Sequence, residues 1–435
     1  PTDDFTSLGD GGSESYYLRI IEGQFREMNW VSYYGIWDVN YKEKYYLNAS
    51  LSYDGLSLLS EKRRYNFFPS VIGAWRLSSE KPLLGSSIIE DLKLTAGWSN
   101  SGNLFSSVYD NSRLYYTSVR IGKYGVPVRE TIPNEDLELE KKTTVHGGID
   151  ASLFRQGLNL RATYFLSNVN NLIIPQTLDS YYGFTEYYNN GGVIQNSGIE
   201  LFAETKFSVG EIKFLFQAVV NTLNQEIKEL DFLQADQTKL ITQVNAIEVV
   251  NQRVNRLNSF YGYKTNGVYQ SNTSVIGPNG TFMQEGDIAY VDVDGNNIIN
   301  DLDKMDIGNP SPDLYGGFQG SIQYRRIGID FNLKFSQGND IFNYSKWVME
   351  SMSDLANQGT DVINRWNYNG QNELPRYASG DPSGNNEFSD RWIEDGSYLK
   401  LKDLSISYNM PIIGNIYKKL NCVRQCFQFA HGDKI

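Results

Sequence analysis

The sequence predicts an all-β fold, an antiparallel up-and-down transmembrane β-barrel, and three observations carry that prediction. Apolar and polar residues alternate with a period of two along about eleven long segments. Short turns alternate with long polar loops between these segments. The 435 residues include 30 Tyr, 22 Phe and 7 Trp. Many of these rings lie near segment ends, where the interfacial girdles of a membrane barrel would use them.

The alternation is clearest in the segment 327–336. One face carries Ile327, Ile329, Phe331, Leu333 and Phe335, and the other carries Asp330, Asn332, Lys334 and Ser336. The same pattern recurs in 45–54, 158–167, 199–207 and 212–221. Four apolar residues interrupt the polar faces: Phe165, Phe202, Leu215 and Val219. A period of two indicates strands with one mainly apolar and one mainly polar face.

Strand length favours a membrane barrel over an ordinary globular sheet. We expect strands at 29–41, 45–54, 67–78, 91–99, 139–153, 157–168, 191–207, 211–226, 313–325, 327–336 and 397–410. Globular strands have a mode of about 5–6 residues, whereas a tilted membrane strand needs about 9–11. All the expected strands have about 9 residues or more, as a membrane strand requires.

The connections also follow the pattern of an outer-membrane barrel, with short periplasmic turns and long external loops. The tight turns are expected at 42–44, 154–156, 208–210 and Arg326, and the connection 79–90 is the longest on that side. The long loops are expected at 55–66, 100–138, 169–190, 227–312 and 337–396. Within the polar stretch 225–255, the spacing of Ile227, Leu230 and Leu233 predicts a short external helix.

Composition excludes several other classes of protein. So aromatic a chain is not expected to be disordered, and two cysteines cannot staple a disulfide-rich fold. The two histidines are far apart in sequence, which argues against a His-based metal site or triad. A formal charge of −12 argues against nucleic acid as a partner. The sequence contains no run of 18 apolar residues, so no transmembrane helix is expected.

Two other classes remain open on these observations. A soluble β-rich glycan-binding protein would also show alternating strands, and recovery without detergent would favour it. An enzyme has the least support and is not expected, since the carboxylate pairs Asp301/Asp303 and Glu394/Asp395 have nothing in the sequence that places them in a cleft.

The segment 196–201 reads Asn-Ser-Gly-Ile-Glu-Leu. Other short motifs stand at 53–55, 67–70, 74–76, 92–98, 101–103, 259–264, 267–270, 286–287, 307–313, 337–343 and 391–401, with an acidic run from Asp292. In chain order, the stretches resemble the C-terminal half of SusC/RagA-type TonB-dependent outer-membrane receptors, the nutrient importers of the Bacteroidetes, whose N-x-G-I-E-L strand is similar to 196–201. Each stretch is weak alone, but their order over roughly residues 50–400 is specific.

The resemblance implies a location, a function and partners. The family has a 22-stranded barrel, an internal plug domain and an extracellular SusD-like lipoprotein lid, so about 11 of 22 strands would lie in this chain. It implies residence in the cell outer membrane and import of oligosaccharides, or of peptides, powered through the TonB system. The lipid bilayer, the lipoprotein and the imported substrate are then the expected partners.

Both ends of the chain depart from the family pattern. The plug and the TonB-contacting segment would precede Pro1, and there is no signal peptide. We therefore expect a fragment or processed chain that does not transport alone. We expect residues 1–411 to form the C-terminal barrel portion and residues 412–435 an anomalous tail from a truncated or altered reading frame. Both cysteines, Cys422 and Cys426, lie in that tail.

An acidic loop at 292–303 is the best candidate site. Oxygen-bearing side chains stand at positions 1, 3, 5, 9 and 12 of an EF-hand-like spacing, at Asp292, Asp294, Asn296, Asn300 and Asp303. Ile298 at position 7 would add its backbone carbonyl. This pattern suits Ca²⁺. Asn297 replaces the usual Gly at position 6 and Asp303 replaces Glu at position 12, which should weaken affinity. A solvated acidic turn held by Asx hydrogen bonds is the alternative.

The long loops also carry aromatic residues that could stack on sugars. They are Tyr182, Tyr187, Tyr188, Trp347, Trp366 and Tyr377. Aromatic residues in loops more often pack the loop itself, so we expect packing rather than ligand stacking.

Overall fold

The computed structural model describes most of the chain. The described residues are 28–103, 116–121, 124–129, 132–155, 157–178, 181, 186–230, 239–244, 247–251, 257–367, 374–409 and 425–427. The expected anomalous tail lies outside these residues except for 425–427, so that domain boundary stays a prediction.

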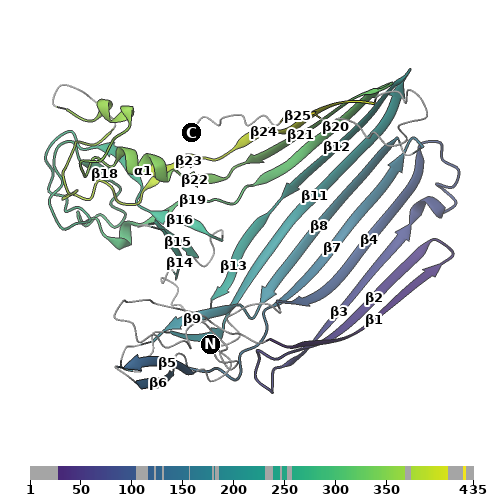
Figure 1. Ribbon diagram of the computed structural model, residues 1–435, viewed down its shortest axis with the longest axis horizontal. Coiled ribbons are helices and arrows are strands. Elements are labelled where there is room, and N and C mark those ends of the chain that lie inside the picture. Colours follow the sequence, from purple (N-terminus) through teal and green to yellow (C-terminus); the bar gives the residue numbers. More distant parts are fainter. Residues whose placement is uncertain are drawn as a thin grey trace.

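A single large antiparallel sheet dominates the fold (Figure 1). Its thirteen strands are β1 (Trp30–Tyr41), β2 (Tyr45–Leu56), β3 (Tyr65–Arg76), β4 (Ile89–Gly102), β7 (Lys141–Leu153), β8 (Leu158–Asn170), β11 (Gly192–Val209), β12 (Ile212–Thr222), β13 (Asn224–Leu230), β20 (Leu314–Tyr324), β21 (Ile327–Gln337), β24 (Tyr398–Tyr408) and β25 (Gln425–Phe427). The eleven strands expected from the sequence are all present. β25 pairs with β24, and β13 folds back onto the first part of β11.

Each strand pairs with the next large strand along the chain, which confirms the up-and-down order. The short turns gather at one end of the strands and the long loops at the other (Figure 1). At β20–β21, Tyr324 is paired with Ile327, leaving a two-residue turn. The first turn residue, Arg325, has a φ of 50°, and such left-handed positions match the twist of adjoining strands.

Alternation in the sequence becomes a continuous apolar face because directly paired residues of neighbouring strands lie on the same face of the sheet. One row of directly paired residues crosses eight strands from β1 to β12. Its members are Tyr41, Tyr45, Trp75, Leu94, Ile149, Ala162, Leu201 and Val220. An apolar face of this width on a sheet of long strands is what lipid requires.

The neighbouring row, on the opposite face, carries charge. Arg76 pairs with Lys93, Lys93 with Asp150, and Asp150 with Arg161. Arg161 Nε lies 2.6 Å from Asp150 Oδ1. This polar face corresponds to the lumen of a membrane barrel.

Aromatic rings on the apolar face lie towards both strand ends. Near the short turns, the ring of Tyr45 stacks against Tyr41 and Trp75 with centroids 6.5 and 6.3 Å away. Near the long loops, Tyr53 stacks on Tyr65 at 5.3 Å. Eight residues separate Tyr45 from Tyr53, about 20 Å along the membrane normal at a tilt near 40°. That spacing fits two interfacial girdles around an apolar band.

Substituting Ile149 by Arg should therefore destabilise the barrel by about 2–4 kcal/mol. Ile149 lies on the apolar face, four positions before the strand end at Leu153, near the middle of the apolar band. Thr163→Arg is the matched control, because Thr163 lies on the polar face of the next strand and should cost about 1 kcal/mol or less. Denaturant unfolding in lipid vesicles measures both. Equal costs would contradict the assignment of faces.

The connecting segments contain the remaining elements. These are β5 (Tyr116–Ile121), β6 (Tyr124–Arg129), β9 (Ile173–Thr177), β10 (Glu186–Asn190), β14 (Lys239–Val244), β15 (Ile247–Asn251), β16 (Ser259–Gly262), β17 (Thr265–Val268), β18 (Ile288–Tyr290), β19 (Met305–Gly308), β22 (Asp340–Phe342), β23 (Ile393–Asp395), the α-helix α1 (Tyr344–Glu350), and the 3₁₀ helices η2 (Leu77–Ser79), η5 (Asp301–Asp303), η6 (Thr360–Asn364) and η7 (Asp390–Trp392).

The helix expected within 225–255 was wrong. The described part of that stretch forms β13, β14 and β15 instead. β13 pairs with residues 192–197 of β11, and Ile227 is buried against that extension. A long-range strand pairing thus overrides the local helical spacing.

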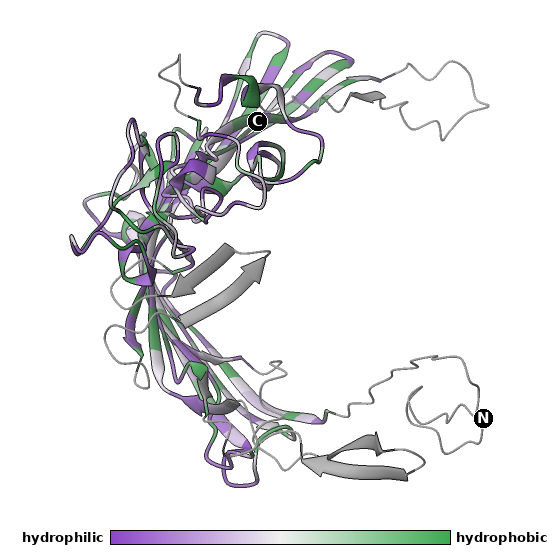
Figure 2. Cartoon of the chain, turned by 90° about the vertical axis from the view of Figure 1, so that its left-hand side faces the viewer, coloured by the Kyte–Doolittle hydropathy of each residue, from purple (hydrophilic) through white to green (hydrophobic). Residues whose placement is uncertain are grey.

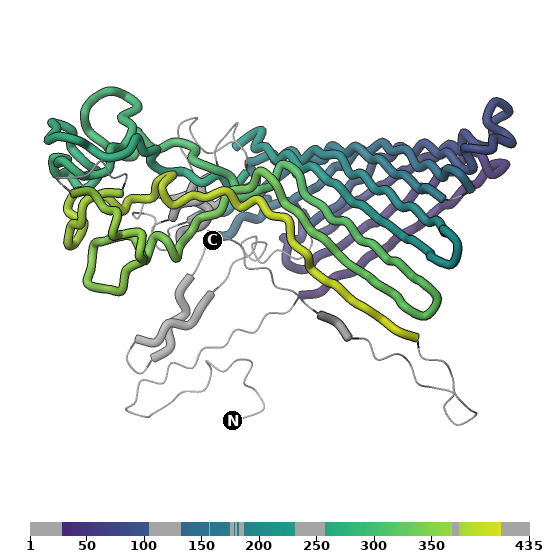
Figure 3. Tube along the Cα trace, turned by 90° about the horizontal axis from the view of Figure 1, so that it is seen from above, coloured from purple at the N-terminus to yellow at the C-terminus, as the bar shows by residue number. Residues whose placement is uncertain are grey.

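The two longest loops fold together beyond one end of the strands (Figures 1 and 3). We call the described residues 257–313, 338–367 and 374–397 the loop domain. Much of the buried apolar core lies there, including Met283, Tyr290 and Trp392, rather than within the sheet.

The sheet curves into an arc (Figure 2). Within the described residues, β1 has β2 as its single neighbour, and β24 pairs with β25 over Leu404, Ser405 and Ile406 alone beyond its ladder with β21. Both ends of the arc therefore present backbone groups on an open edge. Among the helices in the described part of the chain, none is long and apolar enough to cross a membrane.

Candidate functional site

The loop domain is held by contacts between segments more than a hundred residues apart. Tyr263 pairs with Ser389 in a parallel bridge, and its backbone N–H donates to the carbonyl of Phe388 at 2.9 Å. The N–H and hydroxyl of Thr265 donate to Asp390 Oδ1 at 2.9 and 2.6 Å. These bonds join the start of one long loop to the end of the other.

A fully buried carboxylate lies at the centre of the loop domain. Asp287 is 0 % exposed, and Arg376 Nε donates to its Oδ1 at 2.7 Å. The side-chain amide of Asn385 donates to the same oxygen at 2.9 Å, and the N–H of Gln284 donates to Oδ2 at 2.8 Å. Every partner is a hydrogen-bond donor, so the ionised form is well satisfied despite burial.

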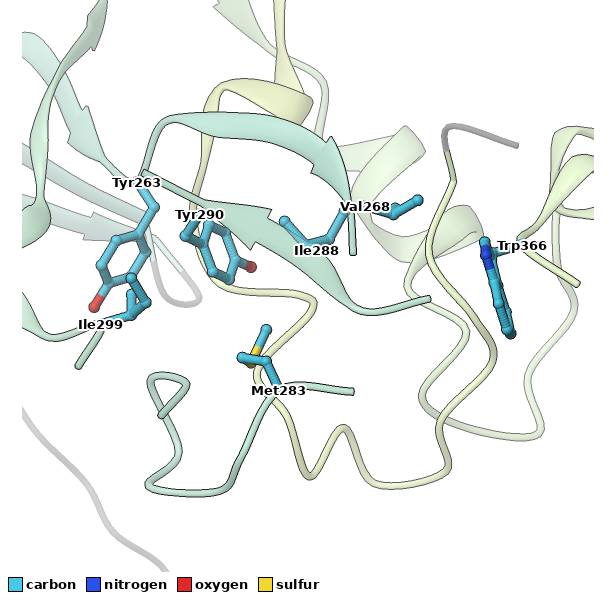
Figure 4. Packing of buried hydrophobic residues seen from close by; sticks show 7 residues of the cluster. All are labelled: Tyr263, Val268, Met283, Ile288, Tyr290, Ile299 and Trp366. Atoms are coloured by element: carbon cyan, nitrogen blue, oxygen red, sulfur yellow. The ribbon is translucent and has the colours of Figure 1, made fainter. Parts of the chain in front are cut away.

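The loop domain also contains a cluster of buried apolar residues (Figure 4). It consists of Tyr263, Val268, Met283, Ile288, Tyr290, Ile299 and Trp366. Ile299 belongs to the acidic loop, so this packing fixes one side of that loop. Trp366, expected to pack rather than to present its ring to ligand, is 8 % exposed.

A second buried charge, that of Arg391, lies in the stretch 391–401, one of those that resemble the receptor family. Burial lowers the pKa of Arg391 to about 10, which still leaves it charged at neutral pH. Its guanidinium lies 4.1 Å from the Trp392 ring centroid, and Nη2 donates to the carbonyl of Glu350 at 3.1 Å. Burial also raises the pKa of Glu350. These residues join α1 to η7 within the loop domain.

The acidic loop brings three of its expected ligands together. One carboxylate oxygen from each of Asp292, Asp294 and Asp303 lies within 4.8 Å of the other two. Oxygens bound to one Ca²⁺ at about 2.4 Å lie at most about 4.8 Å apart. The three carboxylates are therefore close enough to share one ion.

The other expected ligands take part in turns. Asn296 Oδ1 accepts from the N–H of Ile298 at 2.6 Å, and its amide donates to Asp294 Oδ2 at 2.8 Å. Asn300 caps η5 by accepting from the N–H of Leu302 at 2.9 Å. The carbonyl of Ile298 accepts from Asn300 Nδ2 at 3.3 Å and retains a second lone pair.

Backbone donors keep the first aspartate ionised. Desolvation raises the pKa of Asp292, but the N–H groups of Asn297, Gly295 and Asn296 outweigh it and hold the pKa below its ordinary value. Asn297 has a φ of 61°, so Asn does adopt the left-handed turn expected at position 6. Asp303 is 0 % exposed and accepts from Val293 and Asn300.

The remaining candidates have local structural partners. Glu394 Oε1 lies 3.0 Å from Lys346 Nζ, and Asp395 accepts from the N–H of Ser397 at 2.9 Å. Trp347 donates to the carbonyl of Asn386 at 3.1 Å. Tyr182 and Cys422 lie outside the described residues, and no side-chain geometry is described for Cys426.

A curved sheet of long antiparallel strands, apolar on one face and charged on the other, defines an outer-membrane β-barrel protein. A model of the family described as TonB dependent receptor-like, beta-barrel, matches residues 3–421. The chain belongs to this family. It is an outer-membrane protein, and its family consists of receptors and transporters rather than enzymes. This confirms the fold, location and SusC/RagA-type resemblance expected from the sequence.

Individual relatives agree with that assignment. The chain is 29% identical over 409 residues to TonB-dependent receptor P3 of Formosa agariphila, covering 88% of this chain and 39% of that one. It is 25% identical over 438 residues to the TonB-dependent receptor SusC of Bacteroides thetaiotaomicron, covering 94% and 41%. The solved RagAB peptide transporter has the same fold, with a TM-score of 0.78 at 20% identity, covering 92% and 43%. The chain thus spans about two fifths of the length of these relatives.

Proposed function

We propose that the chain forms the C-terminal part of a receptor that imports an oligosaccharide, or a peptide, across the outer membrane. The observation that carries the proposal is the two-faced sheet, whose polar face would line a lumen below the loop domain. The family membership and the match to SusC support the same function. Energy would come through the TonB system, and a SusD-like surface lipoprotein would lie over the loop side.

Uptake by cells that express the receptor tests this proposal. Fluorescent oligosaccharides and peptides should accumulate in the periplasm of these cells, and accumulation should stop when a protonophore collapses the inner-membrane gradient. Cells with the gene deleted are the control. Accumulation that survives the protonophore, or that is equal in the deletion strain, would contradict energy-dependent import.

We further propose that the acidic loop binds Ca²⁺ through Asp292, Asp294, Asp303 and the carbonyl of Ile298. The side chains of Asn296 and Asn300 would complete the coordination shell, directly or through water. Three converging carboxylates support the proposal, since they repel one another unless a cation lies between them. Bound Ca²⁺ would then rigidify the loop domain.

Substituting Asp294 by Asn should lower Ca²⁺ affinity about tenfold, equivalent to about 1.4 kcal/mol. Asp294 is exposed and its partner is the adjacent Asn296, so the change removes charge with little loss of structure. Asp301→Asn is the matched control, because Asp301 lies in the same loop but pairs with Lys304 at 2.8 Å. Calorimetric titration with Ca²⁺ measures both. Absence of heat and of a thermal shift in the unaltered protein would exclude the site.

A further inference from the structure

A hollow of about 440 Å³ lies in the polar face where β12, β20, β21 and β24 approach the loop domain. Two tyrosines are among the residues that line it. Tyr315 of β20 is paired with Ser336 of β21, and Ser336 with Tyr398 of β24. The backbone positions of the two tyrosines therefore lie two strands apart, about 10 Å, with the small Ser336 between them. Side chains that extend from positions so spaced leave room for one sugar unit between them.

The walls of the hollow offer hydrogen-bonding groups. Asn221 is paired with Tyr315, and Asn332 and Ser336 also line the space. Gly317 forms part of the floor, where a Cβ would lie 3.0 Å from the carbonyl oxygen of Leu333. Amides and hydroxyls beside aromatic rings are the groups that recognise saccharide hydroxyls and ring faces.

Two lysines lie directly opposite each other at this hollow. Lys334, which lines it, is paired with Lys400 of β24. Like charges in directly opposed positions destabilise a sheet. Asp403 lies nearby, opposite Asn332, yet among the described residues no ion pair within 4 Å joins a carboxylate to either lysine. Some cations elsewhere on this face are paired, as Arg161 is with Asp150, whereas Lys334 has a second lysine directly opposite it.

A β-bulge creates this arrangement. The β21–β24 register shifts between Asn332 and Leu333, so Asn332 is opposite Asp403 but Leu333 is opposite Leu401. If the register at Asn332 continued without this shift, Lys334 would face Leu401, and Lys400 would lie opposite Phe335 on the apolar side. Bulges re-aim side chains next to functional sites. Here the bulge turns Lys400 and Tyr398 towards the polar face.

We propose that this hollow is a binding subsite for an acidic saccharide, with Tyr315 and Tyr398 flanking the sugar ring and Lys334 and Lys400 pairing with its carboxylate or sulfate. The subsite deepens the import function proposed above and rests on it, because it assumes that the polar face lines the lumen. The bound anion would relieve the repulsion between the two lysines. Since one anionic group lies between two cations, the interaction should weaken as salt rises.

Calorimetric titration of the receptor, purified in detergent from its native outer membrane, tests the subsite with three probes. These are hexagalacturonate, its methyl-esterified neutral form and a hexaglutamate peptide. We expect hexagalacturonate to bind best, and the double substitution K334Q/K400Q to weaken it about tenfold while leaving the weaker binding of the neutral ester unchanged. The double substitution Y315A/Y398A should weaken the binding of both hexagalacturonate and its neutral ester.

The control is Lys213→Gln, an exposed lysine on the same face at the short-turn end of β12, which should change nothing. Equal loss with Lys213→Gln, no loss with K334Q/K400Q, or preference for the peptide would overturn the proposal. Energy-dependent uptake measured on the same variants distinguishes failure of the subsite proposal from failure of the import proposal. Uptake that persists unaltered in K334Q/K400Q leaves import standing and removes the subsite, whereas no uptake by the unaltered receptor removes import itself.

Discussion

Replacing Asp287 by Ala should destabilise the loop domain by about 3–5 kcal/mol, the usual cost of removing one partner of a buried ion pair. The carboxylate is 0 % exposed and accepts hydrogen bonds from the side chains of Arg376 and Asn385 and from the N–H of Gln284. Its loss leaves all three donors without their acceptor, and that desolvation penalty is larger than the value of any one bond. Because Asp287 lies just before the acidic loop, Ca²⁺ binding should weaken in the same variant.

Hydrogen exchange of residues 257–313 and 338–397 measures this effect separately from the barrel. The matched control is Asp301→Ala. Its ion pair with Lys304 has an N–O distance of 2.8 Å, against 2.7 Å for Arg376 and Asp287, but the side chain of Asp301 is 88% exposed. An exposed pair contributes about 0–1 kcal/mol. Similar losses in the two variants would show that burial of Asp287 does not decide its contribution.

The strands could be predicted from sequence because their signal is local. A period of two needs no knowledge of the partner strand, and apolar residues such as Leu160 and Leu201 appear on the expected face. The acidic loop was equally local, since its carboxylates lie within twelve residues. The carboxylates of Asp292, Asp294 and Asp303 converge as that spacing predicts, whereas Asn296 and Asn300 take part in turns.

The loop domain could not be predicted because its contacts are long-range. Thr265 donates hydrogen bonds to Asp390, 125 positions away, and the local sequence around either residue does not predict this contact. The same reason explains the wrong helix in 225–255, where pairing with β11 decided the structure. The lysine pair of the hollow depends on the register between β21 and β24, and the pattern within one strand does not say which residue of the partner strand lies opposite.

The edges at β1 and β24, which are open among the described residues, should keep this chain from inserting stably into a membrane by itself. The 435-residue chain, refolded alone into lipid vesicles, should fail to give a stable membrane-inserted state. β1 has twelve residues, and about half of them direct both N–H and C=O away from β2. In lipid each such unsatisfied group costs several kcal/mol. The sum for one edge exceeds the roughly 5–15 kcal/mol by which native proteins are stable.

Supplying strands that pair with β1 and β24 should therefore rescue insertion. A heat-modifiable band on electrophoresis and protection of the strands from protease report the inserted barrel, and a complete receptor of the same family is the positive control. Co-refolding with a polypeptide that carries the complementary strands should restore both signals. A cooperative melt of the 435-residue chain alone in vesicles would mean that the edges are satisfied another way, by closure of β1 onto β24 or by edge pairing between two copies. Cross-linking between cysteines placed on β1 and β24 distinguishes those two arrangements, because closure gives an intramolecular product and pairing of copies gives a dimer.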